Sequence, residues 1–406
     1  MRRNILMKLI VLFLSFAISS FGSDLEIKSR KAYPAGNETL PPIIRLDEKL
    51  TIEFDVESGS NPNLNLYFRF CDINWNIYEN IFVENVDYNV ERSLWLEKTN
   101  PDVVGSDFHY KGDFPNQNVL IQFPGKWKYF VTDYFDTSIV YSEGKFIVVS
   151  DEVSLELNLS RSRLEGKTFS NSTLGQSYEL NTKVKLPDSL FSSKIIGLEI
   201  IENQKLSMPI FVSEDHQTEH RFIEWNGIDK LDYIIKDLRP GKENRQVDLR
   251  NHYKYQPPET RANYDGVDVS RLYSNSHKDF NGGSKILHFK NDYAEYMNVK
   301  FELRLANKPN KDVYLIGAFN DWRILPEYRM DLLDDLYFTY AELKRGIYDY
   351  YYISADADGS NIDLFEVEGN EWFTYNDYYV FLYYHTDELG GYDRIIGYNK
   401  FNNGDL

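Results

Sequence analysis

A strict alternation of apolar and polar residues at Leu50–Glu57 limits the fold more than any other feature of this sequence. Every second position is apolar and the positions between are polar: Leu50, Ile52, Phe54 and Val56 against Thr51, Glu53, Asp55 and Glu57. Successive side chains of a strand point to opposite faces, so this pattern predicts a strand with one buried face. The same period returns at Leu64–Cys71 and Asn298–Leu305, and we therefore expect antiparallel sheets.

The composition and the length extend this prediction to the whole chain. Aromatic residues make up 16% of the 406 residues, with 31 Tyr and 26 Phe, and such residues are enriched in strands. A chain of this length exceeds one comfortable hydrophobic core. We therefore expect an all-β protein with little helix, built from tandem immunoglobulin-like antiparallel β-sandwich domains at residues 23–150, 151–290 and 291–406. Strands expected at residues 119–123 and 380–384 would belong to the first and the last domain.

The first 22 residues have the pattern of an export signal peptide. Arg2 and Arg3 precede an apolar run at Leu9–Ile18, and small residues surround Gly22, after which we expect cleavage. The run is too short to span a membrane, and no other segment is long and apolar enough to cross one as a helix. The formal net charge of −18 opposes binding to phosphate backbones, which makes nucleic acid a poor partner.

Short patterns that could indicate reactive or metal chemistry have simpler interpretations here. His216–His220 has the His-x-x-Glu-His order of zinc proteases, but apolar flanks predict two strands joined by a hairpin, in which the histidines would lie about 13 Å apart. The carboxylates of Asp356–Asp363 lack the EF-hand order and predict a turn. Cys71, the single cysteine, is expected to be a buried apolar group without a disulfide.

The segment Val313–Trp322 predicts a buried strand that enters a tight corner. Four apolar residues precede Gly317, and Asn320, Asp321 and Trp322 follow Phe319. This Gly-x-Phe-Asn-x-Trp corner resembles that of early-set immunoglobulin-like modules found beside starch- and glycogen-handling enzymes. Two interpretations are open: contact with a glycan, or closure of a hydrophobic core, since a buried large ring stabilises by about 2 to 3 kcal/mol without any ligand.

Motifs spread along the chain resemble the plug protein of the bacterial type 9 secretion system. They form blocks in order: Cys71, Asp72 and Trp75; His109, Tyr110, Pro115 and Asn116; residues 124–129; Gly241, Glu243 and Arg245; Asp279, Asn281 and Gly282; Gly317, Phe319, Asn320 and Trp322; Gly369, Thr374, Asn376 and Tyr378; Tyr392, Asp393 and Arg394. The blocks resemble strand ends, corners and hairpins rather than catalytic motifs, so we expect structural roles for them. They occur in all three expected domains, which a lone sugar-binding module would not explain.

The resemblance implies a non-catalytic exported plug. Such a protein resides in the periplasm, associated with the outer membrane, and seals the periplasmic mouth of the outer-membrane translocon barrel by protein contact. It needs no catalytic residue, cofactor or metal, and the polar, tyrosine-bearing segment Asn251–Tyr273 is the candidate contact region. The alternatives are an exported glycan-binding accessory protein, based on the Phe319–Trp322 corner, and a hydrolase, for which the sequence has no nucleophile elbow, phosphate loop or Cys/His pair.

Overall fold

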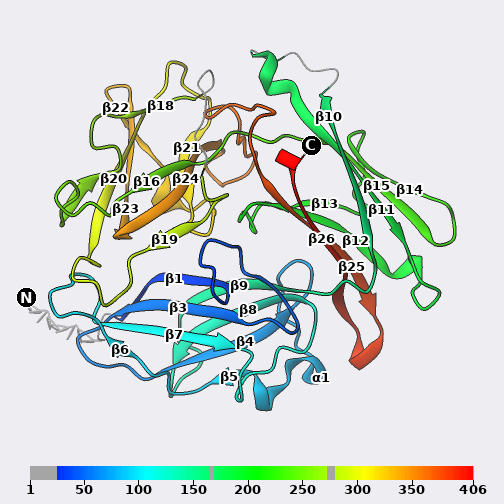
Figure 1. Cartoon of the computed structure of the whole chain (residues 1–406), viewed down its shortest axis with the longest axis horizontal. Coiled ribbons are helices and arrows are strands. Elements are labelled where there is room, and N and C mark those ends of the chain that lie inside the picture. Colours follow the sequence, from blue (N-terminus) through cyan, green and yellow to red (C-terminus); the bar gives the residue numbers. More distant parts are fainter. Residues whose placement is uncertain (1–24, 165–168, 170, 272–278, 406) are drawn as a thin grey trace, which may run out of the picture.

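The computed structural model describes residues 25–164, 169, 171–271 and 279–405, and strands dominate it (Figure 1). The prediction of an all-β protein with little helix is confirmed. The predicted signal peptide at residues 1–22 lies outside the described residues. Within the described residues six sheets pack in pairs as three sandwiches, which we call the first, the middle and the third.

The first sandwich packs two sheets around an aromatic core. One sheet has the order β1 (Glu26–Pro34), β3 (Leu50–Glu57), β7 (Phe108–Phe114), β6 (Glu97–Lys98), and the other has the order β2 (Ile43–Arg45), β9 (Val140–Val149), β8 (Gly125–Asp133), β4 (Leu64–Cys71), β5 (Val90–Glu91). The alternation that predicted β3 and β4 places Phe54 and Phe68 in this core. The short helices α1 (Ile81–Glu84) and η1 (Val86–Tyr88) lie between β4 and β5 in the chain.

The middle sandwich combines two parts of the chain that are far apart in sequence. One sheet has the order β10 (Leu155–Arg163), β11 (Gln176–Lys185), β15 (Lys230–Leu238), β14 (Arg221–Trp225), and the other has the order β13 (Ile210–Val212), β12 (Ile195–Glu202), β25 (Asp377–Thr386), β26 (Tyr392–Asn402). Thus the last two strands of the chain complete a sheet that starts near residue 195 (Figure 1). Among the described residues, short helices lie in the loops of this region at η2 (Ser172–Gly175), η3 (Ser192–Lys194) and η5 (Glu388–Gly390), and η6 (Asn403–Asp405) follows β26.

The third sandwich contains the strands that come between the two parts of the middle one. In one sheet β24 (Gly346–Ala355) pairs with β16 (Arg245–Asp248), β19 (Ser284–Ile286) and β21 (Asp312–Gly317). In the other, β20 (Tyr296–Arg304) pairs with β23 (Leu336–Lys344), and β22 (Asp331–Leu333) extends this sheet beyond β23. Two short strands, β17 (Glu259–Arg261) and β18 (Asp268–Val269), pair with β20 in parallel, and η4 (Pro326–Tyr328) precedes β22.

Two central strands, β24 and β25, are buried on both faces. The tyrosines of β24 at Tyr348, Tyr350 and Tyr352 share one face in the core of the third sandwich, as the alternation predicted. The opposite face of β24 packs in a second cluster around Trp322. In the same way, one face of β25 belongs to the core of the middle sandwich, and the other packs against β9 of the first sandwich. Strands buried on both faces have continuous rather than alternating apolar sequences.

The sheets group the chain differently from the predicted domain limits at residues 150 and 290. The third sandwich interrupts the middle one, and the strands at residues 380–384 and 392–397, which were expected to close the last domain, belong to the middle sandwich. Periodicity alone does not indicate which sheet a doubly buried strand joins. The limits themselves stay predictions, because strand pairing does not test which segments fold alone.

Two local predictions in loops are wrong. Residues 119–123 do not form a strand, because the Asn116 side chain accepts the N–H of Val119 at 2.9 Å and turns the chain away from the sheet. The segment His216–His220 is not a hairpin either, since β13 before it and β14 after it belong to different sheets. The turn predicted at Asp356–Asp363 is confirmed, with an isolated antiparallel bridge between Ser354 and Asp363 at its base.

Removing residues 377–406 tests whether the middle sandwich depends on its two C-terminal strands. The truncated chain loses the neighbour of β12 along Ile195–Glu202, so amide hydrogen exchange of β11 and β15 should become fast while β3 and β4 stay protected. A chain that ends at Asn403 keeps both strands and serves as the control. Unchanged protection of β11 and β15 in the truncated chain would contradict the shared sandwich.

Candidate functional site

The motif residues predicted from the sequence lie where distant segments meet. Asp72 accepts the N–H groups of Asn74 and Asn76 at 2.8 Å and so shapes the turn after β4, which ends at Cys71, a buried free thiol. Asp393 accepts the N–H of Ile73 from the same turn at 3.3 Å. Trp75 and Tyr392 pack at this junction, and Arg394 pairs with Glu152 close by. The first and the last motif blocks therefore join the first sandwich to the middle one.

The block from His109 to Asn116 contributes to the contact between the first and the third sandwich. His109 contacts Asp55 at 2.7 Å between Nδ1 and Oδ1, and the other carboxylate oxygen accepts Lys344 Nζ at 2.6 Å. Burial alone would raise the pKa of Asp55, but His109 and Lys344 hold it below its ordinary value. The remaining members of the block have local roles: Tyr110 packs on Phe54, Pro115 follows β7, and Asn116 shapes the next turn.

The Gly-x-Phe-Asn-x-Trp corner is a packed corner and not an exposed ring platform. Asn320 accepts the Gly317 N–H at 2.9 Å, and Phe319 packs against Phe301 in the core of the third sandwich. Trp322 is 1% exposed and donates its indole N–H to the carbonyl of Gly282 at 3.0 Å. Gly282 has a φ of +88°, and a Cβ there would lie 3.3 Å from the Trp322 ring, so this turn requires glycine.

The remaining motif blocks hold the connection between the middle and the third sandwich. Glu243 accepts the N–H of Tyr375 at 2.8 Å, and the Gly241 carbonyl accepts the Thr374 hydroxyl at 2.8 Å. Asn376 donates to the carbonyl of Pro240 at 2.6 Å. Gly369 and Tyr378, which flank Thr374–Asn376 in the sequence, are both buried. Each motif block thus contacts another segment that is remote in sequence, which explains why they resemble corners and strand ends.

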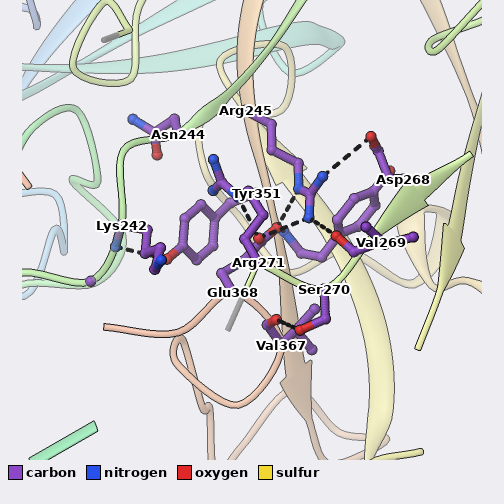
Figure 2. A network of polar contacts seen from close by, with 12 residues as sticks. Lys242, Asn244, Arg245, Asp268, Val269, Ser270, Arg271, Tyr351, Val367 and Glu368 are labelled. Atoms are coloured by element: carbon purple, nitrogen blue, oxygen red, sulfur yellow. Dashed lines mark hydrogen bonds and ion pairs between the residues drawn. The ribbon is translucent and has the colours of Figure 1, made fainter. Parts of the chain in front are cut away.

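A buried carboxylate, Glu368, is the centre of a polar network that also includes Arg245 of the motifs (Figure 2). Glu368 is fully buried; it accepts Arg245 Nε at 2.7 Å and Nη2 at 3.0 Å, and Arg271 Nε at 2.9 Å. Burial alone would raise the pKa of Glu368, yet the two guanidinium groups hold it below its ordinary value. The carboxylate is therefore ionised at neutral pH, and its charge is matched inside the protein.

The same network anchors the loop region that the sequence predicted as a contact candidate. Asp268 accepts the hydroxyl groups of Tyr350 at 2.7 Å and Tyr352 at 2.9 Å, and pairs with Arg245 at 3.2 Å. Ser270 donates to the Val367 carbonyl at 2.7 Å (Figure 2). Part of the segment thus lies along the edge of a sheet, held by side chains as well as by β17 and β18.

Sequence analysis missed Glu368, Asp268 and Arg271 as members of this site. The only local signal is an acidic residue between Val367 and Gly369 at the end of a mostly apolar stretch. Its partners lie about a hundred residues away in the chain, and no local spacing could have indicated them.

Tyrosine rings on segment 251–271 are exposed to solvent. Tyr253 is 81% exposed and Tyr264 53%. His252 stacks on Tyr293 with 4.0 Å between the ring centroids, which orders the start of the segment. Tyr273, the predicted end of the contact region, lies outside the described residues.

A second exposed aromatic surface lies at one end of the first sandwich. Trp95 and Phe135 are each 84% exposed, and Asn65 ties their loops together. The buried Asn65 side chain accepts the Ser93 N–H at 3.1 Å and donates to the Tyr134 carbonyl at 3.4 Å. We call Trp95, Tyr134, Phe135, Ile139 and Val140 the aromatic end of the first sandwich; each of them is substantially exposed. Single exposed apolar residues are ordinary, whereas contiguous exposed apolar patches are typical of interaction sites, and Asn65 holds these two loops next to each other.

The described residues contain no group of three or more His, Cys, Asp or Glu side chains placed to hold a metal ion. His216 contacts the Ser213 hydroxyl at 3.0 Å, and His220 lies beside Glu219 in the loop between β13 and β14. Among the described residues, no helix is both long and apolar enough to cross a membrane.

Taken together, the described residues define an all-β protein of three packed sandwiches with exposed aromatic residues on its loops. Residues 27–150 match the family model described as the type 9 secretion system plug protein 1st domain. The match supports a type 9 secretion system plug-like family, confirms the resemblance predicted from the motifs for this part of the chain, and suggests a plug-like role in type 9 secretion.

A solved structure shares the fold over nearly the whole chain. It is a hypothetical protein from Parabacteroides merdae ATCC 43184, with a TM-score of 0.74 and 18% sequence identity, and the likeness covers 94% of this chain and 98% of the other. At this identity the likeness shows the fold alone. No curated protein matches this chain.

Replacing Glu368 with Gln tests whether the network anchors segment 251–271. The substitution removes the buried negative charge that two guanidinium groups share, so the free energy of unfolding should fall by about 3 to 5 kcal/mol. Because the pKa of Glu368 is depressed in the folded protein, its stabilising contribution is present above the unfolded pKa and is lost as the pH falls through the folded value. Urea unfolding measured at neutral and at acidic pH checks both effects, and the difference between the two proteins should shrink at acidic pH.

Glu366→Gln is the matched control, since this exposed carboxylate lies two residues away and the amide keeps an oxygen that can accept the Ser354 hydroxyl. This substitution should change the free energy of unfolding by no more than about 0.5 kcal/mol. Equal effects of the two substitutions would contradict the role assigned to Glu368.

Proposed function

We propose that this protein is a non-catalytic exported plug that docks on the periplasmic mouth of an outer-membrane translocon barrel of type 9 secretion and seals it. The observation that supports this most is the match of residues 27–150 to the first domain of plug proteins. The motif blocks of the middle and third sandwiches, from Gly241 to Arg394, resemble the same family and extend the support beyond the matched region.

The contacts between the sandwiches suit a plug, because a seal requires a body whose parts keep their positions. Lys126 of the first sandwich pairs with Glu199 of the middle one at 2.7 Å, with both side chains buried. Tyr383 donates its hydroxyl to the same carboxylate at 2.7 Å. Lys344 of the third sandwich pairs with Asp55 of the first, also fully buried. Each sandwich is thus joined to another by polar contacts that are satisfied in only one arrangement.

We propose the aromatic end of the first sandwich as the docking surface, because it lies within the matched region and its Trp95 and Phe135 rings are highly exposed. Tryptophan and other aromatic residues dominate the binding energy of protein interfaces. A stable interface of about 1,600 Å² would cover this end and the loops around it. Release would require a state of the barrel that binds the plug less tightly, since only a difference in affinity shifts such an equilibrium.

The glycan-binding alternative has no support in the geometry of the corner on which it was based. Trp322 is buried and its indole N–H is already bonded to Gly282. A sugar platform needs an exposed aromatic face. The corner at Trp322 therefore does not support glycan binding.

Purification of the tagged protein from native outer membranes tests the proposed function. We expect a large barrel to copurify with the full chain, and the double substitution Trp95→Ser and Phe135→Ser to reduce its recovery at least tenfold, because two hot-spot rings of about 2 kcal/mol each would be lost. Phe373→Ser is the matched control, since Phe373 is exposed on another loop. Recovery of the barrel with the single substitution Tyr253→Ser tests in the same experiment whether segment 251–271 contributes to docking.

Sealing is measured separately, as the conductance of the purified barrel in a planar bilayer with and without the protein. A barrel that stays conducting at saturating protein would contradict sealing. Absence of the barrel from the native purification would contradict docking, and retention with the double substitution would exclude the aromatic end as the docking surface.

A further inference from the structure

The middle sandwich has a cavity of about 480 Å³ that opens between its two sheets at one end. Its apolar lining comes from three strands: Ile195 and Ile196 of β12, Ile223 and Trp225 of β14, and Leu231 and Tyr233 of β15. The volume lies within the range of about 300–1,000 Å³ that ligand sites have. No motif block and neither of the contact surfaces described above includes these residues.

Trp225 shows that the sandwich is incomplete at this end. In the pairing of β14 with β15, Trp225 lies opposite Leu231 and Ile223 lies opposite Tyr233, so these four side chains share one face. That face points inward, since Leu231 and Tyr233 belong to the core of the middle sandwich. Trp225 is nevertheless 50% exposed. An inward-facing tryptophan in a closed sandwich would be covered by the opposite sheet.

The opposite sheet lacks strand cover at the same end. Strand β13 has three residues and pairs only with Leu198–Ile200 of the longer β12. On the side of β13, no described strand lies beside Ile195 and Ile196, whereas β25 flanks β12 on the other side. After Val212 the chain leaves this sheet and crosses to β14 (Figure 1). The length of β12 without a strand neighbour on this side is in line with β13 and borders the cavity, and within it the Ile195 N–H is already bonded to the Ser192 carbonyl.

A buried hydroxyl at the cavity has no partner. The Tyr233 side chain is fully buried, and its Oη has no hydrogen-bond partner among the residues that the structure describes. Leaving such a group unpaired is unfavourable, because its bond to water is lost and not replaced. Burial, and to a lesser degree the nearby Glu214 carboxylate, raise the pKa of Tyr233, so the hydroxyl stays a donor. It lacks an acceptor, and a backbone carbonyl is an acceptor that every added strand presents.

The loop beside the cavity is acidic. Residues 213–220 include Glu214, Asp215 and Glu219 and contain no lysine or arginine. Glu214 and Gln217 of this loop line the cavity directly. A segment that enters here meets negative charge at the entrance and apolar side chains within.

We propose that this cavity is a docking site for an extended segment of a partner protein, which adds a strand beside Ile195 and Ile196 in line with β13. The segment inserts an aromatic or large aliphatic side chain between the sheets and has lysine or arginine at neighbouring positions. Strand addition supplies backbone hydrogen bonds for affinity, and the cavity selects the side chain. The free edge favours a peptide over a small molecule, which could fill the cavity without pairing with β12. This inference does not depend on the plug proposal.

Fluorescence anisotropy with the full chain and a labelled peptide, Lys-Val-Lys-Phe-Lys-Val-Lys with capped ends, tests the proposal. We expect saturable binding, with affinity at least fivefold lower in Tyr233→Phe and lost in Ser193→Trp, which places a ring at the exposed rim of the cavity. Tyr178→Phe is the matched control, because the Tyr178 hydroxyl of the same sandwich is already bonded to the Trp372 carbonyl at 2.7 Å. Binding to this control should be unchanged.

The melting temperatures of the unliganded variants give a readout independent of binding. Tyr233→Phe should melt at or above the temperature of the full native chain, whereas Tyr178→Phe should melt below it, since only the latter loses a hydrogen bond. A peptide with glutamate in place of lysine, and one with proline in place of valine, should each bind at least tenfold more weakly. No binding at millimolar peptide, equal binding of the proline peptide, or a lowered melting temperature in Tyr233→Phe would each overturn the proposal.

Discussion

Burial of β25 on both faces is the constraint on which the arrangement of this molecule depends. One face completes the core of the middle sandwich, and the other, with Phe381 and Tyr383, packs on β9 of the first sandwich. The apolar area that β25 removes from water stabilises both contacts at once. The buried pair of Lys126 and Glu199 links the first sandwich to the middle one, and its two desolvated charges are matched when the sheets hold this relative position.

The third sandwich is held by the same combination of apolar packing and matched buried charge. Its strand β24 contributes Tyr350 and Tyr352 to one core and also hydrogen-bonds Asp268 with both hydroxyl groups. Arg245 donates to the Val269 carbonyl and Glu368 accepts Arg271, and these bonds tie the following residues of segment 251–271 to the sandwich. A segment with only two short strands is thereby ordered, which allows exposed rings such as Tyr253 to have defined positions.

Sequence analysis predicted the features that depend on neighbours in the chain and missed those that depend on distant partners. Strands β3 and β4 followed from alternation, and the corner at Trp322 was predicted as one of two interpretations, because burial of a large ring needs no ligand. The pairing of β25 with β12 could not be predicted, since a strand buried on both faces has no alternation to indicate its sheet. For the same reason the partners of Glu368 were not visible, although Arg245 was singled out by its motif. The motif residues were expected to have structural roles, and their positions at contacts between distant segments agree with that expectation. The sequence does not indicate, however, which motif block contacts which other segment.

The account holds that the three sandwiches form one rigid body that presents contact surfaces at its ends. Pulsed electron spin resonance between pairs of labels tests this most directly, with cysteines introduced one per sandwich at exposed positions, as Asp136→Cys, Lys183→Cys and Asp334→Cys. The native Cys71 is buried and its raised pKa keeps the thiol protonated, so it should not take the label. The account predicts a single narrow distance distribution for each of the three pairs. A broad or two-peaked distribution for any pair would contradict it.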